Sequence, residues 1–312
     1  MKPFAFVFPG QGSQAVGMLD AWGDHPAVHR TLEEASAALS EDIGRLIHEG
    51  PKEALELTTN TQPVMLTAAI ACLNAWRAEG GPEPAAVAGH SLGEYSALVA
   101  AGALTLADAL PLVRHRAQAM QEAVPVGVGA MAAILGLDAA VVKEVCEGVA
   151  REAGAVVSPA NFNDPKQTVI AGAKVAVDAA CEKLKAAGAK RALPLPVSAP
   201  FHCALMKPAA ERLRERLQTV AIAPPRIPVV NNIDVAVQTE PLAIREALYR
   251  QAFGPVRWVE VVQALAGRGL GHVFECGPGK VLAGLVKRID GGLGTGTVLD
   301  PVTLAELKGA LQ

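Results

Sequence analysis

The sequence has 312 residues, of which 51% are hydrophobic and only 4% are aromatic, so alanine, valine and leucine must fill a large core. This composition is typical of helices packed on a parallel sheet, whereas the net charge of −3 argues against a nucleic-acid-binding protein. No apolar run reaches the roughly 18 residues of a membrane span, and five cysteines without a C-x-x-C pair indicate neither a disulfide framework nor a metal site, so we expect a soluble, cytoplasmic protein.

The chain alternates between short apolar runs, which are typical of buried strands, and segments with helical periodicity. Before residue 125, the predicted strands are 4–8 and 85–88. The predicted helices of this part are 26–40, 62–77, 94–101 and 105–123. Pro63 is expected in the first turn of the second helix. This alternation predicts an α/β fold with a mostly parallel sheet that helices cover on both faces.

The pattern changes between residues 126 and 197. Strands are predicted at 130–135, 155–160, 168–171 and 191–197, and helices at 138–152 and 175–187. This β-α-β-β-α-β order matches the ferredoxin-like unit, so we expect 126–197 to form a small domain inserted into a main domain of 1–125 and 198–312. After the insertion, the main domain is predicted to add helices at 206–220, 242–253 and 259–266, and strands at 228–232 and 271–276.

The segment Gly89-His90-Ser91-Leu92-Gly93 reads G-x-S-x-G, the nucleophile-elbow motif of α/β-hydrolase-like domains. A predicted strand precedes it and a predicted helix follows it. In that context a tight turn projects a serine hydroxyl toward a base. A plain glycine-rich turn is the alternative, because glycine-rich chains produce this pattern by chance. The flanking elements favour Ser91 as a nucleophile.

A serine nucleophile needs a base, and His202 is the best candidate among the seven histidines. It follows a predicted strand end and a Ser-Ala-Pro loop, and sites of open α/β sheets lie beyond such strand ends. No aspartate between Ser91 and His202 follows a strand of the main sheet. We therefore expect a Ser-His dyad in which a neutral acceptor, such as a backbone carbonyl, orients the imidazole.

The oxyanion that forms on attack needs two N–H donors. One is expected from Leu92, the residue after the nucleophile, and the other from Gln11 in the loop after the first strand. Residues 10–15 of that loop also match G-x-G-x-x-A, a dinucleotide-binding fingerprint. The fingerprint also requires a following helix and an acidic residue at a second strand end, whereas the acids about 20 residues on lie in a helical stretch. Nucleotide binding is therefore disfavoured.

Arg116 falls four residues after Leu112 and four before Met120, on the apolar side of a predicted helix. A buried guanidinium requires an anionic partner. The partner is either a carboxylate of the protein, in an internal salt bridge, or a carboxylate of the substrate, held by the guanidinium fork. Spacing alone leaves both alternatives open.

Several motifs occur in one order along nearly the whole chain. They are FPGQGSQ at 8–14, TQP at 61–63, GHSLGEY at 89–95, R-x-x-x-M-Q at 116–121, GAM at 129–131, NFN at 161–163, VVNN at 229–232 and GPGKVL at 277–282. In these motifs the chain resembles the malonyl-CoA:acyl carrier protein transacylases, which load malonyl groups for fatty-acid synthesis. The resemblance implies the same two-part fold and acyl transfer through a malonyl-serine intermediate.

The resemblance also implies roles for individual residues. It assigns Ser91 as the nucleophile and His202 as its base, with Gln11 and the N–H of Leu92 in the oxyanion hole. It implies that Gln251 supplies the carbonyl that orients His202. The substrate-binding residues that it implies are Arg116 for the malonyl carboxylate, Gln251, Phe201, Met120 and Asn161. Phe201 stands where bacterial members often carry serine, and in related polyketide acyltransferases a phenylalanine there accompanies malonyl over methylmalonyl.

The resemblance implies malonyl-CoA as substrate and acyl carrier protein as partner, without a bound cofactor or metal. Because carrier proteins are acidic, a basic surface is expected to meet them. The candidates are Lys183, Lys185, Lys190 and Arg191 on the small domain, or Lys287 with Arg288. Two rival functions stay open: an esterase or lipase, which has no need of Arg116, and a non-enzymatic carrier-protein docking module, which tolerates the loss of Ser91.

Overall fold

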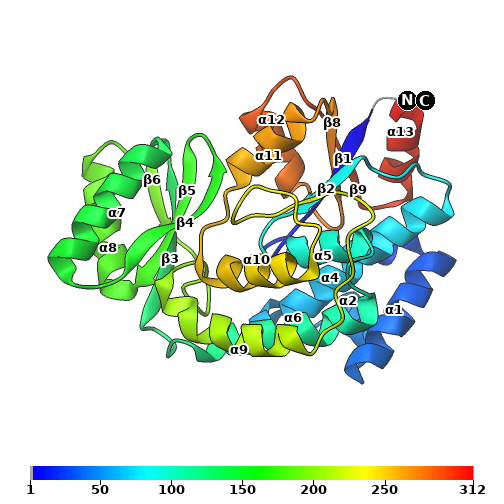
Figure 1. Cartoon of the computed structure of the whole chain (residues 1–312), viewed down its shortest axis with the longest axis horizontal. Helices are drawn as coiled ribbons and strands as arrows, with labels where there is room; N and C mark the ends of the chain where they lie inside the picture. The colour runs from blue at the N-terminus through cyan, green and yellow to red at the C-terminus, as the bar shows by residue number, and fades with distance from the viewer. Residues whose placement is uncertain (1–2, 312) are drawn as a thin grey trace.

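The computed structural model describes residues 3–311, which form two separate sheets (Figure 1). The first sheet consists of β1 (Phe4–Phe8), β2 (Ala86–Gly89), β7 (Val229–Val230), β8 (His272–Cys276) and β9 (Gly294–Val298), in the order β7-β2-β1-β8-β9. Every neighbouring pair in this sheet is parallel. The second sheet consists of β3 (Gly129–Leu135), β4 (Val157–Asp164), β5 (Gln167–Ala173) and β6 (Arg191–Pro194), in the antiparallel order β4-β5-β3-β6. The chain thus has a mixed α/β fold with one parallel and one antiparallel sheet.

Two sets of helices surround these sheets. The helices of the part with the parallel sheet are α1 (Pro26–Leu39), α2 (Ile43–Glu49), α3 (Lys52–Glu56), α4 (Thr58–Ala78), α5 (Gly93–Ala100), α6 (Leu106–Glu122), α9 (Lys207–Gln218), α10 (Pro241–Phe253), α11 (Trp258–Gly267), α12 (Val281–Ile289) and α13 (Pro301–Leu311). The antiparallel sheet carries α7 (Ala139–Ala153) and α8 (Lys174–Ala186). None of the helices within residues 3–311 is long and apolar enough to cross a membrane.

The central strand β1 is buried along its whole length, and its alternating side chains enter two different cores. Phe4, Phe6 and Phe8 belong to the larger core, where Phe6 stacks edge-on against Trp76 of α4 with ring centroids 5.3 Å apart. Ala5 and Val7 face a second core that includes residues of α11 and α12. The register pairs Phe8 with Gly89 at the carboxyl ends of β1 and β2. The two loops that follow these strands therefore start side by side.

The antiparallel sheet lies at one end of the molecule (Figure 1). Its chain order is β3-α7-β4-β5-α8-β6, and β6 takes an outer edge, where Pro194 costs no internal ladder bond. Strand β4 forms the other edge and adjoins the rest of the chain. There the N–H of Phe162 donates to the carbonyl of Val256 over 2.9 Å, and the N–H of Val256 donates to that of Ala160 over 2.9 Å. These backbone bonds place β4 beside the segment that follows α10.

The structure confirms the predicted alternation of strands and helices and corrects several boundaries. Helix α4 begins at Thr58 rather than at residue 62, so Pro63 lies inside the helix and not in its first turn. The extra turn is polar, and the Thr61 hydroxyl in it donates to the carbonyls of Leu55 and Leu57. Apolar periodicity does not mark such a turn, so the prediction began the helix too late. The elements missed by the pattern are α2, α3, α12, β9 and α13. The loop at 10–15 leads into turns and a short 3₁₀ helix, so the helix that a dinucleotide fingerprint requires does not follow it.

Candidate active site

The turn between β2 and α5 places Ser91 in a strained position. Its backbone has φ = 51°, a left-handed conformation that serine adopts rarely. The flanking glycines permit the turn, because a Cβ on Gly89 would lie 1.9 Å from the carbonyl carbon of Gly93. A Cβ on Gly93 would lie 2.0 Å from the carbonyl oxygen of Phe8. The G-x-S-x-G spacing is therefore a steric requirement of this turn.

The structure brings His202 against Ser91. Its Nε2 lies 2.6 Å from the Ser91 hydroxyl, although 111 positions separate the two residues. Its Nδ1 lies 3.0 Å from the carbonyl oxygen of Gln251 and 3.2 Å from that of Gly254. Because carbonyls only accept hydrogen bonds, Nδ1 carries the proton and Nε2 presents its lone pair to the serine. Among residues 3–311, no carboxylate forms a hydrogen bond with this imidazole.

The surroundings keep His202 neutral. Burial, and then the positive charge of Arg116, lower the pKa of His202 from 6.5 to about 3. A neutral imidazole that shares a hydrogen bond with a hydroxyl is the arrangement of a general base. The pair can therefore deprotonate the serine as it attacks a carbonyl.

Two backbone N–H groups beside Ser91 have no acceptor among the described residues, namely those of Gln11 and Leu92. The loop and the elbow lie in contact, since a Cβ on Gly10 would lie 2.6 Å from the carbonyl oxygen of His90 and 3.8 Å from the nitrogen of Leu92. The N–H of Gly12 donates to the side chain of Gln14 over 2.7 Å, which holds the loop in shape. Free N–H groups on two sides of a nucleophile are what an oxyanion hole needs.

Arg116 is 2% exposed and lies on α6 with its guanidinium beside the nucleophile. Its Nη1 donates to Oε1 of Gln62 over 2.8 Å. Its Nη2 donates to Oε1 of Gln251 over 3.1 Å and to the Ser91 hydroxyl over 3.3 Å. Within the described part of the chain, no carboxylate lies within salt-bridge distance of this guanidinium. A buried cation whose hydrogen-bond partners are all neutral favours an anionic ligand over an internal salt bridge.

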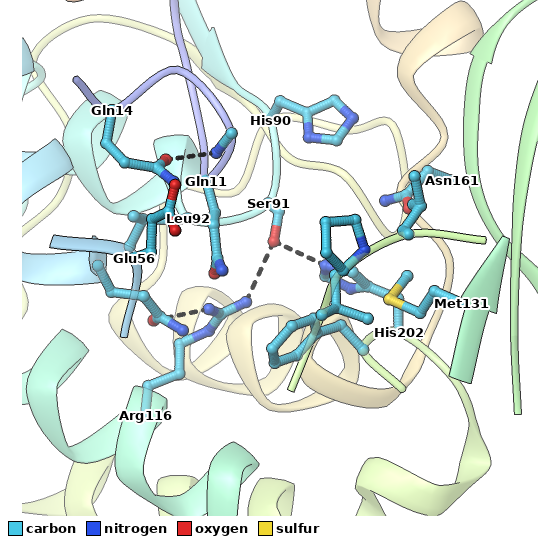
Figure 2. Close-up of a pocket in the computed structure, with 16 residues that line it drawn as sticks. Gln11, Gln14, Glu56, His90, Ser91, Leu92, Arg116, Met131, Asn161 and His202 are labelled. Carbon is cyan, nitrogen blue, oxygen red and sulfur yellow. Dashed lines mark hydrogen bonds between the residues drawn. The ribbon is translucent and has the colours of Figure 1, made fainter. Parts of the chain in front are cut away.

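These groups line one cavity of about 380 Å³ (Figure 2). Seven of the nine residues implied by the resemblance line it, namely Gln11, Ser91, Leu92, Arg116, Asn161, Phe201 and His202. Met131, Leu195 and Val197 add apolar wall. Gln251 is fully buried and contacts Arg116 and His202 from behind. Met120 is 1% exposed in the larger core and is not among the residues that line the cavity.

Sequence reasoning assigned no role to two residues that hold the elbow. Asn232, in the loop after β7, accepts from the N–H of Ser91 over 2.8 Å and donates to the carbonyl of Gly89 over 2.7 Å. Glu94, in the first turn of α5, is buried and accepts from Gln251 and from the N–H of Asn232. The sequence feature that could have identified Asn232 is the pair Asn231-Asn232 at the carboxyl end of a predicted strand, because the functional sites of α/β sheets lie beyond such strand ends.

Comparison with known proteins agrees with this geometry. A family model described as an acyl transferase domain matches residues 5–288. The malonyl CoA-acyl carrier protein transacylase of Escherichia coli K12 is 55% identical over 306 residues, which cover 98% of each chain. The crystal structure of an acyl-carrier-protein S-malonyltransferase from Burkholderia pseudomallei is 64% identical, covers 98% of this chain and 99% of its own, and superposes with a TM-score of 0.97. A malonyl-transacylase solved in complex with a type II PKS acyl-carrier protein is 49% identical with a TM-score of 0.96, and the match covers 99% of both chains. The chain therefore belongs to the acyl transferase family and, within it, to the malonyl CoA-acyl carrier protein transacylases.

Proposed function

We propose that the protein moves a malonyl group from coenzyme A to the phosphopantetheine thiol of acyl carrier protein, for fatty-acid synthesis, through a malonyl ester on Ser91. The observation that carries the proposal is the 2.6 Å contact between Ser91 and a neutral His202, in a cavity that also holds a buried arginine with which no carboxylate of residues 3–311 pairs. The names of the similar proteins support the substrate and the partner.

In the first half-reaction, Nε2 of His202 takes the proton of the Ser91 hydroxyl as Oγ attacks the malonyl thioester carbonyl. The oxyanion of the tetrahedral intermediate lies between the N–H groups of Gln11 and Leu92, and each such donor contributes about 3 kcal/mol in comparable sites. The C–S bond then breaks. The departing coenzyme A sulfur takes its proton from the His202 imidazolium, which restores the neutral base.

The second half-reaction reverses these roles with a new thiol. Nε2 of His202 takes the proton of the phosphopantetheine thiol, and the sulfur attacks the ester carbonyl of malonyl-Ser91. The C–O bond to Ser91 breaks, and the imidazolium returns a proton to Oγ. The protein's own groups and its two substrates are sufficient for both steps, so we propose that no bound cofactor takes part.

Arg116 selects the acyl group in this proposal. Gln62 and Gln251 hold its guanidinium beside Ser91, and the free carboxylate of malonyl provides the anionic partner that no carboxylate among residues 3–311 supplies. Phe201 and Asn161 line the same cavity and complete the proposed substrate contacts. An acetyl group has no carboxylate for Arg116, so binding and orientation favour malonyl.

We also propose finer assignments of architecture and location. The order β3-α7-β4-β5-α8-β6 supports a ferredoxin-like unit at 126–197, inserted into an α/β-hydrolase-like unit of 1–125 and 198–312. The nucleophile elbow between β2 and α5 supports the latter description. Five free thiols among the described residues agree with a cytoplasmic location. The basic residues at 183–191 or at 287 and 288 remain the proposed carrier-protein surfaces.

Parallel assays of transfer and hydrolysis test the function. The purified protein receives malonyl-CoA with holo acyl carrier protein in one assay and a neutral p-nitrophenyl ester in the other. We expect malonyl-carrier protein to form quickly, little ester hydrolysis, and the loss of transfer in Ser91→Ala. Rapid ester hydrolysis without transfer would identify an esterase, and carrier-protein binding without transfer would identify a docking module.

A further inference from the structure

Glu94 is a buried acid with neutral partners. It lies three positions after the nucleophile and is 2% exposed. Its Oε2 accepts from Nε2 of Gln251 over 3.0 Å and from the N–H of Asn232 over 2.9 Å. Within residues 3–311, no lysine or arginine forms a salt bridge with it. Burying a carboxylate without a cation in contact is costly, so this position indicates a need for a strong acceptor.

The Glu94 carboxylate helps to decide the orientation of the Gln251 side-chain amide. The Oε1 of Gln251 accepts from Arg116 over 3.1 Å, and its Nε2 donates to Glu94 and, over 3.1 Å, to the carbonyl of Ser91. A half-turn of the amide would exchange its oxygen and nitrogen at almost no steric cost. The turned amide would aim N–H groups at the Arg116 guanidinium and its oxygen at two acceptors. Glu94 supplies one of the two acceptors that exclude the turned amide.

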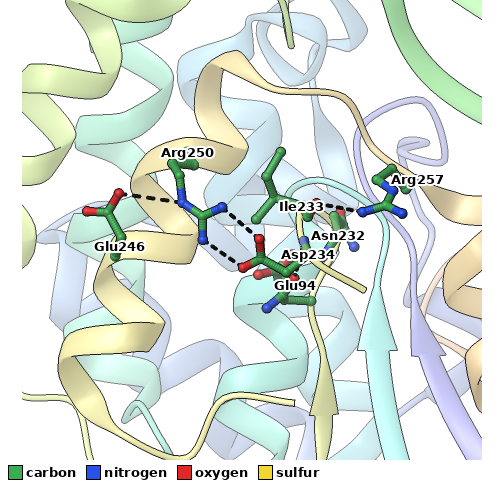
Figure 3. Close-up of polar contacts among 8 residues, drawn as sticks. Glu94, Asn232, Ile233, Asp234, Glu246, Arg250 and Arg257 are labelled. Carbon is green, nitrogen blue, oxygen red and sulfur yellow. Dashed lines mark hydrogen bonds and ion pairs between the residues drawn. The ribbon is translucent and has the colours of Figure 1, made fainter. Parts of the chain in front are cut away.

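The segment that carries Asn232 is anchored (Figure 3). Because the N–H of Asn232 donates to Oε2 of Glu94, this anchoring also helps to hold the Glu94 carboxylate in place. Arg250, the residue before Gln251, makes two contacts of 2.6 Å with the carboxylate of Asp234. Arg257 donates to the carbonyl of Ile233 over 3.2 Å. Both donors to Glu94 therefore lie on chain segments that are tied to each other. A rigid frame of this kind is needed if one carboxylate is to orient one amide.

We propose that Glu94 is a positioning residue that fixes the direction of the Gln251 amide and, through it, the place of Arg116 beside Ser91. The inference rests on the proposed role of Arg116 in holding the malonyl carboxylate. Without an acceptor at position 94, only the Ser91 carbonyl and Arg116 itself still oppose the turned amide, so the amide also samples the turned orientation, which presents N–H groups to Arg116. The guanidinium then shifts away from Ser91, so malonyl transfer suffers and acetyl transfer, which needs no guanidinium, does not.

Two variants of matched length separate the hydrogen bond from the charge. Glu94→Met removes both the charge and the acceptor. Glu94→Gln removes only the charge, because the backbone N–H of Asn232 holds the new side-chain oxygen where Oε2 was. For Glu94→Met we expect kcat/KM for malonyl-CoA to fall about 30-fold, mainly through KM, while acetyl transfer changes less than about threefold. For Glu94→Gln we expect both values within about threefold of those of the unsubstituted protein.

Equal losses in the two variants, or an unchanged malonyl preference in folded Glu94→Met, would overturn the inference. Circular dichroism and thermal unfolding establish that the variants fold. If Glu94→Met does not fold, Gln251→Met takes its place, since the inference requires the same selective loss there and a retained malonyl preference contradicts it. Arg116→Ala separates the two proposals. If it leaves the malonyl preference intact, the role of Arg116 has failed. If it removes the preference and Glu94→Met does not, only the role of Glu94 has failed.

Discussion

The backbone N–H of Ser91 donates a 2.8 Å hydrogen bond to the side-chain oxygen of Asn232, which lies 141 positions later in the chain. The nitrogen of the same amide donates to the carbonyl of Gly89 over 2.7 Å. One side chain thus spans the turn that carries the nucleophile, from the residue before His90 to the residue after it. The strained φ of Ser91 persists because the neighbouring loop holds both of these backbone groups.

Asn232→Ala should damage both stability and catalysis. It leaves the N–H of Ser91 and the carbonyl of Gly89 buried without partners, so we expect the free energy of unfolding to fall by about 2 kcal/mol. The loosened turn should lower kcat at least about tenfold. Asn74→Ala, which removes an amide bonded to Thr31 far from the site, is the control. It should lower stability without lowering kcat, and a normal kcat in Asn232→Ala would contradict the role of Asn232.

Arg116→Ala should change the choice of acyl group. Losing the guanidinium removes the partner of the malonyl carboxylate, so kcat/KM for malonyl-CoA should fall about 100-fold or more. Acetyl transfer should stay the same or rise. Arg114→Ala is a matched control on the same helix, because Arg114 pairs with Glu41 at the surface. Competition between malonyl-CoA and acetyl-CoA measures the preference, and an unchanged preference would refute the assignment.

The rate constant of acylation should not fall at mildly acidic pH as it would if the base were a histidine with an ordinary pKa. A base works while it is unprotonated, and a pKa lowered to about 3 keeps His202 unprotonated at every pH above about 4. The rate constant of acylation, measured by stopped flow, should therefore change less than about twofold between pH 8 and pH 5.5. A tenfold loss centred near pH 6.5 that persists in Glu94→Gln would contradict this expectation.

Glu94→Gln controls for the other titrating group of the network. Burial raises the pKa of Glu94 from 4.5 to about 7, so this carboxylate gains a proton as the pH falls through that value. An acid limb that disappears in Glu94→Gln belongs to Glu94. An acid limb that persists in Glu94→Gln belongs to His202 and contradicts the lowered pKa.

Gly93→Ala should destabilise the protein strongly. The added Cβ would lie 2.0 Å from the carbonyl oxygen of Phe8, a backbone atom of the central strand that cannot move cheaply. We expect a loss of about 3 kcal/mol or more in the free energy of unfolding. Gly148→Ala in α7 is the control, because its Cβ would meet no atom within 4 Å. It should raise stability by about 0.5–1 kcal/mol in denaturant titrations. Equal stability of the two variants would contradict the steric account of the elbow.

Much of the fold was predictable because local rules dictate it. The apolar run of β1, the glycines around Ser91 and the single proline of β6 each restrict the backbone directly. The elements that were missed have weaker patterns. Helices α2 and α3 are short, and β9 alternates glycine and threonine, so neither helical nor strand periodicity marks them.

The contacts of the site were less predictable, because they depend on which strands are neighbours. Asn232 reaches Ser91 because β7 pairs with β2, an order that no pattern within either strand reveals. Gln62 reaches Arg116 because α4 and α6 lie against each other, and only the helical period of each was visible. Met120 lies in the larger core and does not line the cavity, so its proposed contact with the substrate rests on the resemblance alone.

Intact-protein mass spectrometry after mixing with malonyl-CoA tests the central claim most directly. We predict a mass increase of one malonyl group, located on Ser91 by peptide mapping and lost on addition of holo acyl carrier protein. We also predict no adduct in Ser91→Ala and a much slower one in His202→Ala, since the base lies 2.6 Å from the hydroxyl. An adduct on another residue, or transfer to carrier protein at full rate without any adduct, would contradict a reaction through malonyl-Ser91.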